Sequence, residues 1–138
     1  MPQVHFDPLE KKEGVYVVEI HPQTVLRKTR RLPPSLNERY HWAVRSAWTK
    51  AFCESAFYAV KAAKVPPMYR ITLTIENQTT HPTDYDNLAA CAKPLIDGLT
   101  LTGIIKDDDP DHLIELKLRS LRVLHRKDEK LLLIIERA

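Results

Sequence analysis

Two proline pairs divide the chain and constrain its fold more than any other feature of the sequence. Pro33-Pro34 and Pro66-Pro67 bracket a segment in which apolar and small residues recur every three or four positions from Val44 to Ala63. That period is typical of an amphipathic helix, and proline is strongly disfavoured inside helices. Ser35-Leu36-Asn37-Glu38, directly after the first pair, matches an N-terminal capping box. We therefore expect one long helix between the two pairs.

A second helix and several strands are expected outside this segment. Leu88, Cys91, Leu95 and Leu99 share one helical face, with Asp86 or Asn87 as the N-cap and Gly103 as the stop. Apolar alternation and β-branched residues predict extended segments elsewhere. These are Val15–Ile20, Thr24–Leu32 (weakly), Tyr69–Ile75, His112–Leu124 and Lys130–Glu136, the last two joined by the charged turn Arg126-Lys127-Asp128-Glu129.

This order of elements predicts an α+β domain: a mixed or antiparallel β-sheet with two main helices packed against it. At 138 residues the chain is expected to form a single domain over 1–138. Its last strand, Leu131–Ile135, is an unbroken run of Leu and Ile. Such a strand is either central and buried on both faces or an apolar edge that meets a second copy.

Charge is distributed unevenly along the chain. The segment from Pro82 to Glu115 carries eight acidic and two basic side chains, whereas the segment from His21 to Lys50 carries seven basic and one acidic. An acidic run is commonly a solvated loop. An acidic block between basic ones is also typical of an enzyme that binds metal with carboxylates and a polyanion with its basic segments.

The acidic block contains a candidate metal site. Asp84 and Asp86 lie two residues apart before a predicted helix, and in extended backbone both carboxylates would point to the same side. Together with Asp107 or Asp108 they can bind one or two Mg²⁺ ions, and Lys93 can then contact a phosphate. Helix capping is the competing interpretation of the Asp84 and Asp86 pair, and a solvated turn that of Asp107 and its neighbours. An EF-hand is excluded because His112 and Leu118 occupy its Gly and Glu positions.

Four motifs occur in one order between Leu32 and Leu124. They are Pro33-Pro34-Ser35-Leu36-Asn37, Asp84-Tyr85-Asp86-Asn87-Leu88, Lys93-Pro94-Leu95-Ile96-Asp97-Gly98-Leu99 and Gly103-Ile104-Ile105-Lys106-Asp107-Asp108. Each alone is weak, but the set resembles the RusA family of Holliday junction resolvases, and most closely its phage-encoded members. Members of that family are small, homodimeric, magnesium-dependent endonucleases that nick four-way DNA junctions symmetrically.

The resemblance implies roles for particular residues. Asp84, Asp86 and Asp108 match the essential metal-binding aspartates, Asp107 the auxiliary acid, and Lys93 the catalytic basic residue. Asp84, Asp86, Asp108 and Lys93 are thus the predicted catalytic set. Mg²⁺ is the predicted cofactor, with Mn²⁺ as a substitute. Seven residues separate Asp86 from Lys93 where the family's prototype has four, and both gaps return to the same helical face.

The loop before Asp84 reads Thr79-Thr80-His81-Pro82-Thr83, whereas the prototype is strongly basic there. We therefore expect DNA contacts to come from elsewhere in the chain. The predicted DNA-binding residues are Arg30, Arg31, Asn37, Arg39, Arg45 and Lys93. His41 and Trp42, which follow this basic region, are expected to make capping or core contacts instead of DNA contacts.

The predicted partners are branched DNA, above all a four-way junction, and a second copy of the chain, with no membrane. No apolar run approaches the roughly 20 residues of a membrane span, and Met1–Leu9 lacks the apolar core of a signal peptide. We therefore expect a cytoplasmic protein of a bacterial or phage-infected cell. Two alternatives remain: a catalytically silent DNA-binding or regulatory module of the same fold, and a broader nuclease acting on flaps or forks.

Overall fold

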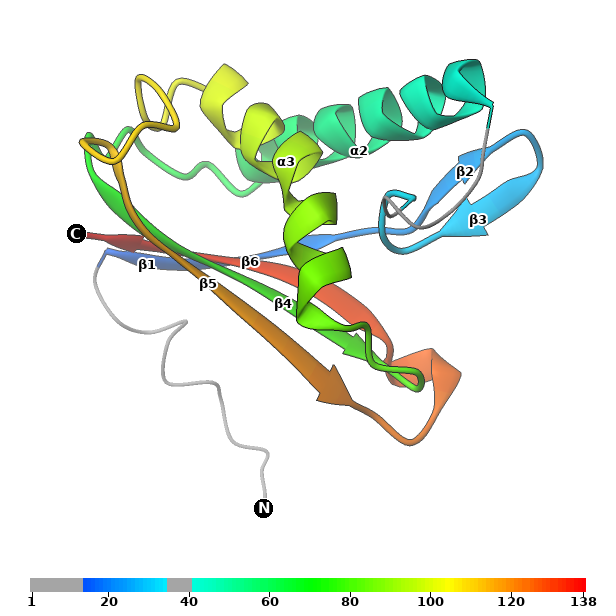
Figure 1. Ribbon diagram of the computed structural model, residues 1–138. Helices are drawn as coiled ribbons and strands as arrows, with labels where there is room; N and C mark the ends of the chain where they lie inside the picture. Colours follow the sequence, from blue (N-terminus) through cyan, green and yellow to red (C-terminus); the bar gives the residue numbers. More distant parts are fainter. Residues whose placement is uncertain (1–13, 35–40) are drawn as a thin grey trace.

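The computed structural model describes residues 14–34 and 41–138, which form a four-stranded sheet with two helices on one face and a separate small hairpin (Figure 1). The helices are α2 (Trp42–Ala62) and α3 (Tyr85–Leu101), with a short 3-10 turn, η1, at Arg126–Asp128. The strands are β1 (Val15–Ile20), β2 (Gln23–Val25), β3 (Lys28–Arg30), β4 (Ile71–Thr79), β5 (Leu113–Arg122) and β6 (Lys130–Arg137).

The sheet is mixed, with the strand order β1-β6-β4-β5. β6 runs antiparallel to both β1 and β4, whereas β4 and β5 are parallel. A parallel pair requires a crossover, and α3 makes it by packing on the sheet between the two strands. The predicted fold class, an α+β domain with a mixed sheet and two helices, is confirmed at this level.

The core lies between the sheet and the two helices. Alternate residues of β4 and β6 point into it, because side chains of a strand alternate between its faces. Trp48 on α2 and Leu95 on α3 meet them from the helices and are almost fully buried. Burying one large apolar side chain of this kind contributes about 2 kcal/mol. The strand residues are Ile71, Leu73, Ile75, Leu131, Leu133 and Ile135, all with no exposed surface.

Helices α2 and α3 approach closely at Gly98. A Cβ atom on Gly98 would lie 2.2 Å from the Cys53 carbonyl oxygen and 2.8 Å from the Ala56 Cβ. Only a residue without a side chain permits this contact between the helix backbones. Gly98 therefore sets how α3 sits on α2, and with it where the polar face of α3 is presented.

The C-terminal strands differ from the expectation of two segments joined as a hairpin. β4 lies between β5 and β6, so the two do not pair with each other. β6 is a central strand whose Leu133 and Ile134 are buried on opposite faces. The interpretation of Leu131–Ile135 as a dimer edge is therefore wrong, and its apolar composition is explained by burial on both sides.

β1 and β5 are the two edge strands of the sheet, and β5 lies outside β4. The residues of β5 are mostly exposed, and Ile114, Leu116 and Leu121 keep between 38% and 40% of their surface accessible. An edge strand presents unpaired backbone groups to solvent or to a partner. The apolar side chains of this sheet edge are therefore on β5.

Two predictions near the start of the chain also need correction. The Thr24–Leu32 segment is not one strand, because Leu26 and Arg27 both have positive φ and turn β2 back onto β3. This two-residue turn lacks the Gly or Asn that usually marks it in a sequence. Helix α2 begins at Trp42, after the non-helical His41, whose imidazole accepts a hydrogen bond from Ala43. His41 thus caps the helix as expected, but Trp42 is 76% exposed and not a core residue.

The capping motif at residues 35–38 lies outside the described residues. Within the described ranges, neither helix combines the length and apolarity needed to cross a bilayer. Cys53 and Cys91 are free thiols, the first half-buried and the second buried.

Candidate active site on helix α3

The acidic loop leads directly into α3. Asp84 is the N-cap residue, with extended backbone, and Asp86 lies in the first helical turn. The N-cap thus lies two residues before Asp86, the earlier of the two predicted caps. Because Asp86 is helical, the two carboxylates do not project from one extended run as we expected.

The two carboxylates at the start of α3 have no side-chain partner in the described part of the chain. Asp84 makes no side-chain capping hydrogen bond although it is the N-cap. Asp84 and Asp86 are both exposed, and neither carboxylate has a hydrogen bond or ion pair with any residue that the structure describes. The capping interpretation of this pair therefore lacks its expected contact, and both carboxylates face solvent.

Helix α3 continues through Pro94, which lies inside it and is buried. The proline removes one backbone donor from the helical ladder, but the helix ends only at Leu101, just before Gly103 with φ +84°. Because the helix is unbroken, Asp86 and Lys93 lie on one face as predicted. Seven residues separate them, which corresponds to about 10 Å along the axis.

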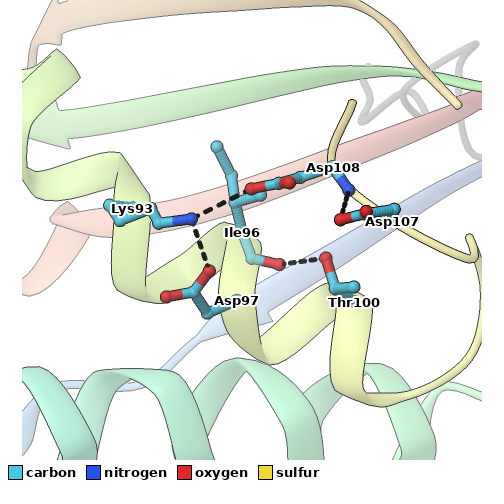
Figure 2. Close-up of polar contacts among 6 residues, drawn as sticks. All are labelled: Lys93, Ile96, Asp97, Thr100, Asp107 and Asp108. Carbon is cyan, nitrogen blue, oxygen red and sulfur yellow. Dashed lines mark hydrogen bonds and ion pairs between the residues drawn. The ribbon is translucent and has the colours of Figure 1, made fainter. Parts of the chain in front are cut away.

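Lys93 is held between two carboxylates from different segments. Its Nζ lies 2.9 Å from Asp97 Oδ1, one turn further along α3, and 2.9 Å from Asp108 Oδ2, in the loop between α3 and β5 (Figure 2). The Asp108 amide donates in turn to Asp107 Oδ1 over 2.8 Å. The structure therefore brings together Lys93, Asp107 and Asp108, three of the predicted site residues, and adds Asp97.

These contacts shift the ionisation of the group. The pKa of Lys93 is raised by its hydrogen bond to Asp97 and then by that to Asp108. The pKa of Asp108 is lowered below its usual 3.8, chiefly by the hydrogen bond from Lys93 and next by the hydrogen-bonding contact with Asp107. Lys93 and Asp108 are thus both charged at neutral pH. Lys93 keeps 65% of its side-chain surface exposed, so a solvent-borne anion can still reach it.

A pocket of about 450 Å³ opens beside this cluster. Its walls come from α2, α3 and the loop after α3. The lining residues are Cys53, Lys93, Asp97, Thr100, Leu101, Asp107 and Asp108. Burial, followed by the negative charges of Asp97 and Glu54, raises the pKa of the Cys53 thiol. Cys53 is therefore a neutral wall of this pocket and not a nucleophile.

The two halves of the predicted metal site stand apart. Over residues 14–34 and 41–138, no three carboxylate, imidazole or thiol side chains lie close enough to bind one ion. Asp84 and Asp86 form one acidic pair at the start of α3, and Asp108 is paired with Lys93 further along. Magnesium commonly uses one or two protein carboxylates and completes its shell with water and phosphate oxygens. The free Asp84 and Asp86 pair fits that requirement by itself.

The predicted arginines that the structure describes lie at the end of β3, just after it and on α2. Arg30 donates from Nε to the Leu32 carbonyl and lies over the Trp48 ring. Arg45 on α2 donates to the Pro34 carbonyl. Arg31 is half-buried at a pocket wall described below. Asn37 and Arg39 lie outside the described residues.

Two positions near the candidate site had no role predicted from the sequence. Asp97 holds Lys93, and its spacing of four residues from Lys93 is a signal that indicates such a pair. Glu129, just before β6, accepts hydrogen bonds from the Thr80 amide and from the Thr79 and Thr80 hydroxyls. It thereby anchors the loop that leads to Asp84, and no sequence pattern links residues so far apart.

The remaining acidic turn after α3 has a structural role at Asp109. Its carboxylate accepts from the backbone amides of Asp111 and His112 and contacts His112 Nδ1 at 2.6 Å. Asp109 therefore closes the turn into β5, in line with the turn interpretation of this part of the loop.

No protein-family model matches this chain, and no curated protein matches it at a significant level.

Proposed function

We propose that the protein is a magnesium-dependent endodeoxyribonuclease of the RusA type, which cleaves branched DNA and resolves four-way junctions by paired nicks. The observation that carries the proposal is the Lys93–Asp108 contact, because it joins two motifs that are 15 residues apart and that the resemblance assigns to one catalytic centre. The unpartnered Asp84 and Asp86 carboxylates on the same helix support it further.

The chemistry follows from these residues. Asp84 and Asp86 would hold Mg²⁺, which supplies charge neutralisation at the phosphate and an acidified water when bound. Lys93 presents an exposed ammonium on the same helical face, where it can bind a non-bridging phosphate oxygen. Asp97 and Asp108 keep that ammonium charged and oriented. The basic residues of β3, Lys28 and Arg30, would bind the DNA backbone.

A homodimer belongs to the same proposal. One chain has one such site, and two symmetric nicks across a four-way junction require two sites related by a two-fold axis. The exposed apolar side chains of β5 support this edge as the contact, because an antiparallel β5–β5 pair would extend the sheet across both copies. Sedimentation at micromolar concentration should give about twice the chain mass of 16.0 kDa. A monomer that still makes paired nicks would contradict this arrangement.

The decisive experiment compares labelled four-way, three-way, flap and linear duplex DNA, each incubated with Mg²⁺ or with EDTA. We expect magnesium-dependent paired nicks in the four-way junction and little cleavage of linear duplex. Cleavage of flaps at the same rate would favour the broader nuclease. Tight junction binding with no cleavage under any metal would favour the catalytically silent module. Binding should also weaken with salt, with a log–log slope of about −0.9 for each phosphate contact.

A further inference from the structure

A second pocket, of about 460 Å³, lies beside the start of α3. Its walls come from the end of β3 and the residues after it, from the end of β4, and from the first turns of α3. Arg31, Leu32, Asn77, Thr79, Thr83 and Asn87 are among its lining residues. Thr83 directly precedes Asp84, so this pocket adjoins the free carboxylate pair.

Two buried polar groups in the pocket wall are unsatisfied. Asn77 is 2% exposed, and its Oδ1 has no hydrogen-bond partner among the residues that the structure covers. Arg31 Nε is likewise buried and without a partner in that part of the chain. A buried polar atom without a partner costs about 1–3 kcal/mol. Two such atoms at one pocket point to a ligand that supplies the missing donor and acceptor.

The ligand needs both kinds of group. Asn77 Nδ2 lies 3.5 Å from the Thr83 hydroxyl, to which it can donate, so Oδ1 is the end left open and requires a donor. Arg31 requires an acceptor. A backbone phosphodiester satisfies Arg31 but has no proton to donate to an amide oxygen, whereas the edge of a nucleobase carries donors and acceptors side by side.

The charge balance of the pocket agrees with a neutral ligand. Glu129 has a lowered pKa, caused chiefly by hydrogen bonds from Thr80 and in smaller part by the Arg31 charge. The Arg31 guanidinium and the Glu129 carboxylate thus lie near enough to offset each other in part. Leu32 and Pro33 add apolar wall to the same pocket, which suits a flat ring more than a small anion.

We propose that this pocket binds one unpaired nucleobase, with Arg31 and Asn77 reading its polar edge. The role of this pocket rests on the proposed function. A base held beside Thr83 would place the adjoining phosphodiester at Asp84 and Asp86, where that function puts cleavage. Branch points supply such nucleotides, since a base that is already unpaired needs little energy to leave the stack. The pocket would therefore select the strand position that is cut.

The test measures binding of neutral deoxynucleosides in EDTA by NMR, following the Asn77 side-chain amide and the backbone amides of Thr79 and Thr83. At least one of the four deoxynucleosides should bind with a Kd of about 10 mM or tighter, and shift these signals, while inorganic phosphate should not. Arg31→Lys, which keeps the charge but lacks Nε, should weaken binding about tenfold. Arg126→Lys, an exposed arginine on η1, is the matched control and should bind as the wild type does.

Asn77→Leu should also abolish nucleoside binding. If Asn77→Leu does not fold, the affinity of Arg31→Lys alone tests the pocket assignment. Absence of any nucleoside binding, shifts caused by phosphate instead, or full affinity in Arg31→Lys would each overturn the pocket assignment. The assay needs neither metal nor junction, so its result is separate from that of the cleavage assay. Nucleoside binding without cleavage would overturn the nuclease, and cleavage without nucleoside binding would overturn only the base pocket.

Discussion

The first turn of α3 and its middle turns both carry aspartates, but the two regions differ in whether those carboxylates have side-chain partners. In the first turn, the Asp84 and Asp86 carboxylates are exposed and have no hydrogen bond or ion pair with the described part of the chain. In the middle turns, Asp97 and the loop residue Asp108 both contact Lys93, and Gly98 presses the helix onto α2. One helix thus has an open acidic end and a satisfied, closely packed centre.

This difference indicates which carboxylates are free to bind a cation and which ones already support the structure. A carboxylate that already accepts from a lysine loses that contact if it binds a cation, whereas a free carboxylate loses only hydration. The open end of α3 is therefore suited to bind a metal, and the centre is suited to position Lys93.

The largest expected effect is on cleavage, from Asp86→Asn at the open end. We expect a loss of about a thousandfold or more in the cleavage rate with Mg²⁺, because one of two metal-binding charges is removed. Junction binding should stay intact or tighten, since a repulsion toward phosphate is also removed. Thermal unfolding should be unchanged because Asp86 has no partner to lose.

Asp128→Asn, on the exposed η1 turn, is the control for that substitution and should cleave normally. Wild-type cleavage by Asp86→Asn would show that the carboxylate pair is not the metal site. Unfolding of the variant would instead show that Asp86 supports the helix start, and the contrast between the two regions would fail.

The next effect comes from the centre of the helix. Lys93→Ala should lower the cleavage rate about a hundredfold and junction affinity much less, because one positive charge matters most where negative charge develops on the phosphate. Lys127→Ala, an exposed lysine outside α3, should change neither. Cleavage rates and binding constants measured on the same junction separate the two effects. An equal loss in both would make Lys93 an ordinary backbone contact.

Packing of the centre is tested by Gly98→Ala. The added methyl group would overlap the Cys53 carbonyl oxygen, so α2 and α3 must move apart. We expect the free energy of unfolding to fall by about 2 kcal/mol, measured from the urea midpoint. Ala89→Ser, on the exposed side of the same helix, should cost about 0.5 kcal/mol. Equal losses in the two variants would contradict close packing at Gly98.

The smallest effect concerns pH. The folded pKa of Asp108 lies below its usual 3.8, so its contact with Lys93 is complete above pH 3.8 and is lost as the pH falls through the lower folded value. Carboxyl NMR titration of the wild type should therefore give a midpoint below 3.8, and Lys93→Ala should raise it. A midpoint that does not move in Lys93→Ala would mean that the lysine does not hold Asp108 in solution.

Local patterns were enough to predict much of this molecule. The predicted strand Val15–Ile20 matches β1, and the helical face of Leu88, Cys91, Leu95 and Leu99 is buried as expected. These predictions depend only on residues within one element, where side-chain period and nearby glycine or proline determine the conformation. The β2–β3 hairpin was missed because its turn residues, Leu26 and Arg27, are not those that usually adopt positive φ.

Which distant segments pair with each other could not be predicted from such local patterns. The run Leu131–Ile135 indicates burial on both faces, but the chain order did not show that β6 lies between β1 and β4. The same limit applies to the contact of Glu129, just before β6, with Thr79 and Thr80 at the end of β4. Such contacts depend on which surfaces bury the most apolar area together, a property of the whole chain.

For the candidate site, the sequence alone was enough to predict that Asp86 and Lys93 share one helix and one face of it, because spacing along a helix sets that face. How the predicted site residues are placed and paired depends on the tertiary structure. It paired Asp108 with Lys93, left Asp84 and Asp86 unpaired, and enclosed Asn77 and Arg31 in a pocket beside them. The physical reason is that ion pairing and burial act between segments brought together by the packed core, whereas helical periodicity acts within one segment.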